Sequence, residues 1–172
     1  MDRVVADSSS EPSDGSDGLD PMAQHENDAV SDRRDGPQQT PRLRLKRKAP
    51  VSGVVDGAWW PHSDDLAAEL PDLLTVLSVR LGTVARVTFN LDEWAPTPRR
   101  LSTDGGVIRL NGYHRQPADT IGVLDLRGNQ LVLLVVPPAT DPVRAHDILM
   151  AAAADGDNSS VASLLAAARA TA

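Results

Sequence analysis

Asp56-Gly57-Ala58-Trp59-Trp60-Pro61 is the stretch around which the predicted fold is organised. Successive side chains of an extended segment point to opposite faces, so we expect one indole to face the core and the other to face outward. A buried Trp removes about 150–250 Å² from water, and the chain has one Phe and one Tyr to share that task. The outward ring lies either under a loop or against a ligand or partner. Packing of both rings by the domain's own helices is the simpler interpretation, because large apolar side chains are usually buried.

Acidic residues are concentrated at the start of the chain. Residues 1–40 hold ten acidic and three basic residues, which accounts for the whole formal net charge of −7. This segment is rich in Ser, Asp, Gly and Pro and cannot bury enough apolar surface to offset its chain entropy. We therefore predict a disordered acidic tail over residues 1–39. It is either a solubilising tail or an arm that mimics nucleic acid or masks a basic patch.

Several classes of chemistry lack a signature here. The chain has no Cys, so thiol catalysis and disulfides are excluded. It has no metal-ligand spacing of His residues, no phosphate-binding glycine loop and no nucleophile elbow, so we expect no cofactor and no metal. The start does not read as a signal peptide, and the apolar run 131–136 is too short to cross a bilayer. We expect a cytoplasmic protein that does not bind membranes.

The rest of the chain predicts a single α+β domain over residues 40–154, then a linker and a short amphipathic helix in residues 155–172. We expect an antiparallel, meandering sheet of about six strands with two helices packed on it. Ser63 is the expected N-cap of the first helix, and Pro71 either kinks or divides that helix. Residues 111–118 are predicted to form a loop. Leucines at helical spacing predict the first helix, and the all-apolar run 131–136 predicts a strand covered on both faces. Asp104-Gly105-Gly106 and Gly128-Asn129 are predicted to join two hairpins. The predicted strands are 42–48, 84–91, 99–102, 107–110, 120–126 and 131–136, and the predicted helices are 63–81 and 141–154.

Several motifs spread along the domain point to one family: Arg42–Lys48, Ala49-Pro50, Val55-Asp56-Gly57-Ala58-Trp59-Trp60-Pro61, Leu66-Ala67-Ala68-Glu69-Leu70-Pro71, Asn90-Leu91, Trp94, Val135-Val136-Pro137-Pro138 and Asp141-Pro142. With these motifs the chain resembles the actinobacterial domain of unknown function 5994, over about residues 41–153. An aromatic residue is common in that family where Val55 stands here. The resemblance implies a small cytoplasmic bacterial domain, and it supplies no reaction, cofactor or active-site residue.

Aromatic and arginine side chains are the remaining candidates for function, because this combination is typical of protein-interface hot spots. We predict a non-catalytic regulatory or adaptor module that binds another protein, with the acidic tail modulating that contact. The predicted contact residues are Trp59, Trp60, Trp94, Arg99, Arg100, Tyr113, His114 and Arg115.

Two alternatives remain open at this point. The first is nucleic-acid or nucleotide-phosphate binding through a basic edge strand, because Lys and Arg neutralise phosphates. Its residues are Arg42, Arg44, Lys46, Arg47 and Lys48. The second is an enzyme with a concealed site near His62, which is close to Asp64 and Asp65, or near His114.

Overall fold

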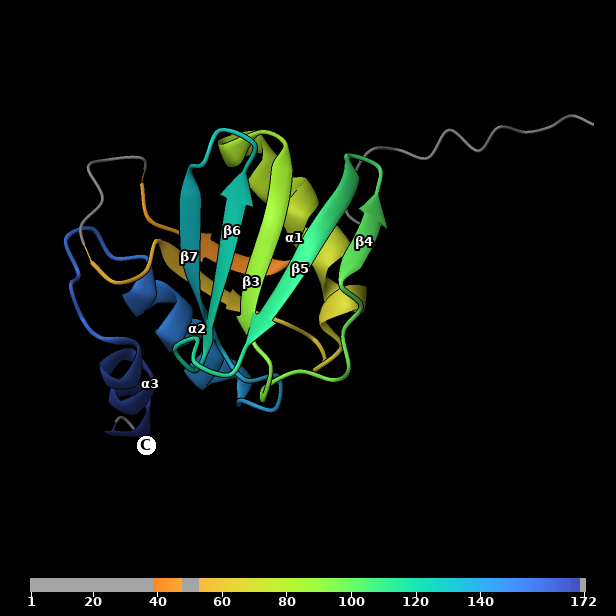
Figure 1. The fold of residues 1–172 in the computed structure, drawn as a ribbon. Coiled ribbons are helices and arrows are strands. Elements are labelled where there is room, and N and C mark those ends of the chain that lie inside the picture. Colours follow the sequence, from red (N-terminus) through yellow and green to blue (C-terminus); the bar gives the residue numbers. More distant parts are fainter. Residues whose placement is uncertain (1–38, 48–52, 171–172) are drawn as a thin grey trace, which may run out of the picture. The chain divides into compact units, whose positions relative to one another are not determined.

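The computed structural model describes residues 39–47 and 53–170, and the side chains of these residues up to 166. They fall within one compact unit, Arg33–Ala172. Residues 1–38 of the predicted disordered tail lie outside the described residues, and so does Lys48. The strands are β1 (Arg42–Leu45), β2 (Gly57–Trp60), β3 (Val84–Asn90), β4 (Arg100–Thr103), β5 (Gly106–Tyr113), β6 (Thr120–Asp125) and β7 (Gln130–Val135), and the helices are α1 (Leu66–Leu81), α2 (Pro142–Ala152) and α3 (Val161–Ala170) (Figure 1).

The seven strands form one mixed sheet in the order β1-β2-β7-β6-β3-β5-β4. The predicted α+β class is confirmed, but the prediction of an antiparallel meander of about six strands is wrong. The pairs β2–β7 and β3–β5 are parallel. The first is parallel because the chain crosses over through α1 between β2 and β3, and β6 and β7 later fill the gap between them. The second is parallel because residues 91–99 cross at one end of the sheet from the end of β3 to the start of the edge strand β4, and β5 then returns between these two strands.

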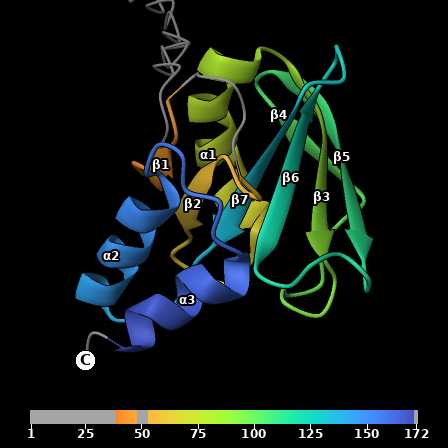
Figure 2. The same ribbon diagram turned by 90° about the vertical axis from the view of Figure 1, so that its left-hand side faces the viewer.

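The two faces of the sheet are covered unequally. One face packs along its length on α1, and that core includes Trp59, Val87 and Ile121. On the other face, α2 packs on β1 and β2, and α3 packs on α2 (Figure 2). The core beneath them includes Ala58, Leu134 and Leu164. No described helix covers the β3, β5 and β4 part of this second face, which is turned toward the viewer in Figure 1.

The Asp-Gly-Ala-Trp-Trp-Pro motif explains how β2 enters the sheet. The Asp56 carboxylate accepts a hydrogen bond from the Val132 N–H at 2.8 Å, and the Asp56 N–H donates to the Val132 carbonyl at 2.7 Å. A Cβ atom at Gly57 would collide with the Arg44 carbonyl, so only Gly allows β1 to approach this closely. Trp59 then points into the α1 core and Trp60 to the opposite face, as the alternation predicts.

Helix α1 runs through Pro71 as one element, so of the two outcomes that the sequence suggested, a kink or two helices, the division into two helices is wrong. Pro71 costs a backbone hydrogen bond, on the order of 3 kcal/mol, but each buried leucine side chain contributes about 1.5–3 kcal/mol. The leucines outweigh the proline because five of them are buried on one side of α1: Leu66, Leu70, Leu73, Leu74 and Leu77. The N-cap is Asp65 and not the predicted Ser63; its carboxylate accepts from the Ala68 N–H at 3.2 Å.

The hairpins agree with the sequence except at one end. The Asp125 carboxylate accepts from the backbone N–H groups of Arg127 and Asn129, both at 2.8 Å, and so closes the predicted turn between β6 and β7. These hydrogen bonds, first among them the one from the Asn129 side chain, lower the pKa of Asp125. The predicted loop 111–118 is wrong in its first part, because β5 continues to Tyr113 by pairing with β3. In the described part of the chain, no helix has the length and apolar character needed to cross a bilayer.

Candidate functional site: an arginine row on the uncovered half of the sheet

Three arginines lie side by side on the uncovered half of the sheet. Arg86 in β3 pairs with Arg109 in β5, and Arg109 pairs with Arg100 in β4. Residues in register across a sheet share a face, and the next residue of each strand, Val87, Leu110 or Leu101, packs on the α1 core. The three arginines therefore project together from the uncovered face, where all three are exposed. We call them the arginine row.

The spacing within the arginine row is short. The Leu110 N–H donates to the Arg99 carbonyl, so Arg100 and Arg109 face each other at a position without hydrogen bonds between them. Cα atoms at such positions are about 4.5 Å apart, which is the closer of the two kinds of antiparallel pair. Adjacent strands are about 4.8 Å apart, so the row extends for roughly 10 Å across three strands.

The arginine row has no balancing negative charge on its strands. β3, β4 and β5 contain no Asp or Glu, and within the described residues none of the three arginine side chains makes a hydrogen bond or ion pair. The nearest acidic residue along β4 and β5 is Asp104, in the turn that joins them. Like charges directly opposite each other in a sheet are destabilising. The row therefore costs folding free energy that a mixed set of surface charges would not.

Polar and aromatic groups flank the arginine row along β5. Asn111 and Tyr113 follow Arg109 at every second residue, so they share its face, and the Asn111 side chain donates to the Tyr113 hydroxyl at 3.2 Å. Tyr113 is 50% exposed. On the other side of Arg109, Val107 is also exposed. The uncovered face thus presents cations, amide and hydroxyl groups and some apolar surface to a partner.

The eight residues predicted as one contact surface are divided among separate places. Trp59 is buried and stacks on Trp94, with ring centroids 5.7 Å apart. Trp60 is half-buried on the α2 face, where its indole N–H donates to the Pro138 carbonyl at 3.4 Å. The guanidinium of Arg42 covers the Trp60 ring at 3.4 Å from its centroid. None of the three indoles therefore lies on the uncovered sheet face.

The remaining predicted residues lie in or beside β4 and β5. Arg100 belongs to the arginine row and Tyr113 flanks it, while Arg99 precedes β4 and is exposed. His114 and Arg115 follow β5 and are also exposed; the His114 ring is 2.9 Å from the Asp92 carboxylate. Arg86 and Arg109 are members of the site that the sequence did not predict. Strand alternation predicts that each faces outward, but only the pairing of β3 with β5 brings them together.

Most basic residues of the first strand are engaged within the protein. Arg42 donates to the carbonyls of Trp60 and Pro61 at 3.0 and 2.6 Å, and desolvation lowers its pKa while the charge of Glu69 opposes that shift. Lys46 donates to the Asp157 carbonyl at 2.7 Å, and Arg47 lies 3.6 Å from the Asp155 carboxylate. The structure describes four of the five basic residues of this segment. Of these four, only Arg44 is exposed with no side-chain partner among the described residues.

The two histidines of the enzyme hypothesis lie next to single carboxylates. Glu69 accepts from the His62 backbone N–H and the Ser63 hydroxyl, and its carboxylate is 3.4 Å from the His62 ring. This arrangement fixes the turn before α1 and leaves Ser63 bonded to a carboxylate rather than to a histidine.

Desolvation raises the pKa of Glu93, which accepts from the Asp119 N–H at 2.6 Å. The described residues contain no group of three or more side chains that could hold a metal ion.

Comparison with known proteins shows the family to which this chain belongs but supplies no activity. Neither a curated protein nor a solved structure matches the chain. Residues 42–152, from the start of β1 to the end of α2, match the family of unknown function DUF5994. This match covers more than half of the chain and includes the Asp-Gly-Ala-Trp-Trp-Pro motif that fixes β2 in the sheet. The protein is a member of the DUF5994 family.

Proposed function

We propose that this domain is a non-catalytic adaptor that binds an acidic segment of another protein across the arginine row. The observation that carries the proposal is the in-register placement of Arg86, Arg109 and Arg100 with no acidic residue in their strands. Local rules of sheet design are broken where function requires it, and here the broken rule is the avoidance of like charges in direct opposition. An anionic partner would remove that repulsion.

The edge of the sheet gives such a partner a means of docking. Because Arg100 faces Arg109 at a position without hydrogen bonds, the Arg100 backbone N–H and carbonyl point away from β5, and so do those of Ser102. β4 is the last strand of the described sheet. An extended segment added beside β4 would bond to these groups, and one of its side chains would continue the row on the same face. A carboxylate at that position would lie opposite Arg100.

The charge balance favours an acidic protein segment over nucleic acid. The domain, residues 40–154, carries 13 basic and 12 acidic residues, so its net charge of +1 gives little attraction for a polyanion at a distance. The row itself spans roughly 10 Å across three strands, which is a short patch compared with a long run of phosphates. Binding to nucleic acid through residues 42–48 remains a prediction; it is weakened because Arg42, Lys46 and Arg47 already have partners within the protein.

Titration with a defined peptide tests this function. The probe is a fluorescein-labelled extended peptide of alternating valine and glutamate, compared with the same peptide carrying glutamine in place of glutamate. We expect the acidic peptide to bind with salt-sensitive affinity and the neutral one to bind at least about tenfold more weakly. Arg109→Gln should weaken binding of the acidic peptide by a similar factor. Arg44→Gln, an exposed strand arginine outside the row, should leave it within about twofold.

Two results would refute the proposal. The first is equal binding of the acidic peptide by the wild type and the Arg109→Gln variant. The second is saturable binding of a single-stranded oligothymidylate that is lost in Arg44→Gln and retained in Arg109→Gln. That second result would instead favour the basic strand as a nucleic-acid site.

A further inference from the structure

One hydroxyl group on the uncovered face lies beside the arginine row. Ser102 is two residues after Arg100 in β4, so the two side chains share a face and their Cα atoms are about 7 Å apart. Ser102 pairs with Val107, which places it diagonally across from Arg109, at a spacing of about 7–8 Å that a long side chain reaches. Ser102 is exposed, and its hydroxyl makes no hydrogen bond within the described residues. A negative charge added to this hydroxyl would therefore lie next to two arginines.

The sequence before Ser102 carries the charges by which a protein kinase selects its substrate. Kinases discriminate between substrates through charge patterns around the acceptor residue, and an acidic substrate cleft favours arginines just before it. Arg99 and Arg100 stand three and two residues before Ser102. Of all the serines and threonines in the chain, only Ser102 has an arginine at both of these positions. The sequence around Ser102 thus points to the same hydroxyl as the geometry of the sheet.

The position of Ser102 in the sheet leaves it accessible to another protein. β4 is the last strand of the described sheet, and the Ser102 backbone N–H and carbonyl point away from β5. A kinase that holds its substrate as an extended segment meets here a segment that is already extended and has a free edge for pairing. β4 is also only four residues long, and a short edge strand opens locally at lower cost than the centre of a sheet.

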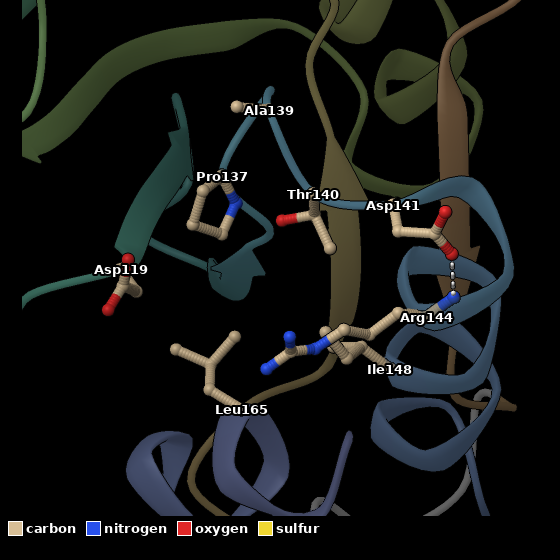
Figure 3. Close-up of a pocket in the computed structure, with 8 residues that line it drawn as sticks. All are labelled: Asp119, Pro137, Ala139, Thr140, Asp141, Arg144, Ile148 and Leu165. Carbon is tan, nitrogen blue, oxygen red and sulfur yellow. Dashed lines mark hydrogen bonds between the residues drawn. The ribbon is translucent and has the colours of Figure 1, made fainter. Parts of the chain in front are cut away.

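Thr140 provides a comparison hydroxyl that lacks this setting. It lines a surface hollow together with residues of α2 and α3, and Figure 3 shows its hydroxyl directed into that hollow. The three residues before it are Pro137, Pro138 and Ala139, and none of them is basic. Phosphate transfer that depends on the arginines before Ser102 should therefore leave Thr140 unmodified.

We propose that Ser102 is a phosphorylation site that blocks the arginine row. A protein kinase supplies ATP, and the Ser102 Oγ atom forms a bond to the γ-phosphorus. The bond from that phosphorus to the oxygen bridging to the β-phosphate breaks, ADP leaves, and the hydroxyl proton passes to a carboxylate of the kinase. The phosphate carries a charge of about −1.5 to −2 at neutral pH and accepts charge-assisted hydrogen bonds from Arg100 and Arg109. The consequence for binding rests on the proposed function, because these two arginines are the ones that an acidic segment would contact.

Incubation of the folded full chain with ATP and the catalytic subunit of cyclic-AMP-dependent protein kinase, which selects serines after paired arginines, tests the site. We expect phosphate on Ser102, located by mass spectrometry of proteolytic fragments. Ser102→Ala should lose this incorporation, and Arg99→Gln should slow it at least about tenfold because it removes one of the charges that the kinase reads. Thr140→Val is the matched control and should be modified as the wild type is. Equal incorporation by the wild type and Ser102→Ala, or none in the wild type, would overturn the site.

Thermal denaturation of the phosphorylated protein tests the contact between the phosphate and the arginines without any partner present. Phosphorylation should raise Tm by about 3 °C or more at low salt, because it replaces repulsion between cations by attraction to an anion. In Arg109→Gln the rise should be at least about twofold smaller, since one of the two contacts is missing. An unchanged Tm in the wild type, or an equal rise in Arg109→Gln, would overturn the contact.

Binding of the acidic peptide then connects the site to the adaptor function. The phosphorylated protein should bind the alternating valine and glutamate peptide at least about tenfold more weakly than the unmodified protein does. Equal binding by the two forms would overturn the inference and leave the adaptor function standing. If the unmodified protein does not bind the peptide, the adaptor function is refuted, and the Tm measurement still decides whether the phosphate contacts the arginine row.

Discussion

Replacing Arg109 by Glu is expected to stabilise the free protein while abolishing its binding of an acidic partner. Arg109 stands between Arg86 and Arg100 in the sheet, so the substitution converts two repulsive cross-strand pairs into two attractive ones. Cross-strand charge pairs contribute roughly 0.2–1 kcal/mol each, and exposure reduces that value. We expect a gain of about 1 kcal/mol in the free energy of unfolding. For a domain of this size that raises Tm by about 3–5 °C.

Urea denaturation followed by Trp fluorescence measures this change, with two reference variants beside it. Arg109→Gln removes the repulsion without adding attraction, so it should give about half the gain. Arg44→Glu introduces the same charge change on an exposed strand residue that faces Ala58, and it should stay within about 0.5 kcal/mol of the wild type. Raising the salt concentration to about 1 M should reduce the difference between Arg109→Glu and the wild type.

A loss of stability in Arg109→Glu, or an equal gain in Arg44→Glu, would show that the arginine row is not electrostatically strained. The argument for a function of the row would then lose its basis, because the three arginines would be ordinary surface residues. A gain in stability together with unchanged binding of the acidic peptide would refute the proposed site while leaving the physical description of the row intact.

Three other measurements test the remaining parts of the structure. In urea denaturation, Trp94→Phe should lower the free energy of unfolding by less than about 1 kcal/mol. The reason is that it keeps a stacked ring and removes an indole N–H that lacks a partner among the described residues. Trp59→Phe should lower it by about 1–3 kcal/mol. Asp125→Asn should destabilise the protein at neutral pH, and the difference from wild type should shrink as the pH falls below about 4. The reason is that the lowered folded-state pKa of Asp125 stabilises the fold above its unfolded pKa, and this stabilisation is lost as the carboxylate is protonated. Replacing the ten acidic residues of residues 1–40 by Asn and Gln should tighten binding of the acidic peptide at low salt and leave it unchanged at high salt; equal affinities at low salt would show that this segment does not compete for the row.

Local sequence patterns were sufficient to predict most of the helices and strands of the fold. The alternation of Trp59 and Trp60 predicted their opposite faces, and the helical spacing of leucines predicted α1 even though it contains Pro71. Turn residues predicted the hairpins β4–β5 and β6–β7, because a short turn forces neighbouring strands to pair. The all-apolar run 131–136 predicted a strand covered on both faces, and β7 has core residues on both of its sides.

These local patterns could not predict the strand order, and for that reason they could not predict the candidate site. The parallel pair β3–β5 depends on the path of residues 91–99, whose route is set by tertiary contacts such as the stacking of Trp94 on Trp59. Only that pairing brings Arg86 opposite Arg109. The predicted cluster of aromatics with arginines assumed that residues typical of interfaces would converge. Instead the indole rings stabilise the interior or lie under Arg42, and of the predicted aromatic residues only Tyr113 lies beside the arginine row.

The parallel pairing of β2 with β7 has a consequence for how the protein is made. Gly57 pairs with Leu133 and Trp59 with Val135, so the two ends of this contact are far apart in the chain. At a synthesis rate of about 5–20 residues per second, Trp59 leaves the ribosome roughly 4 to 15 seconds before its partner strand. Throughout that interval the strand with the two adjacent indoles has an open edge on a nascent chain. Chaperones that recognise exposed aromatic segments will meet this protein at residues 57–60 first.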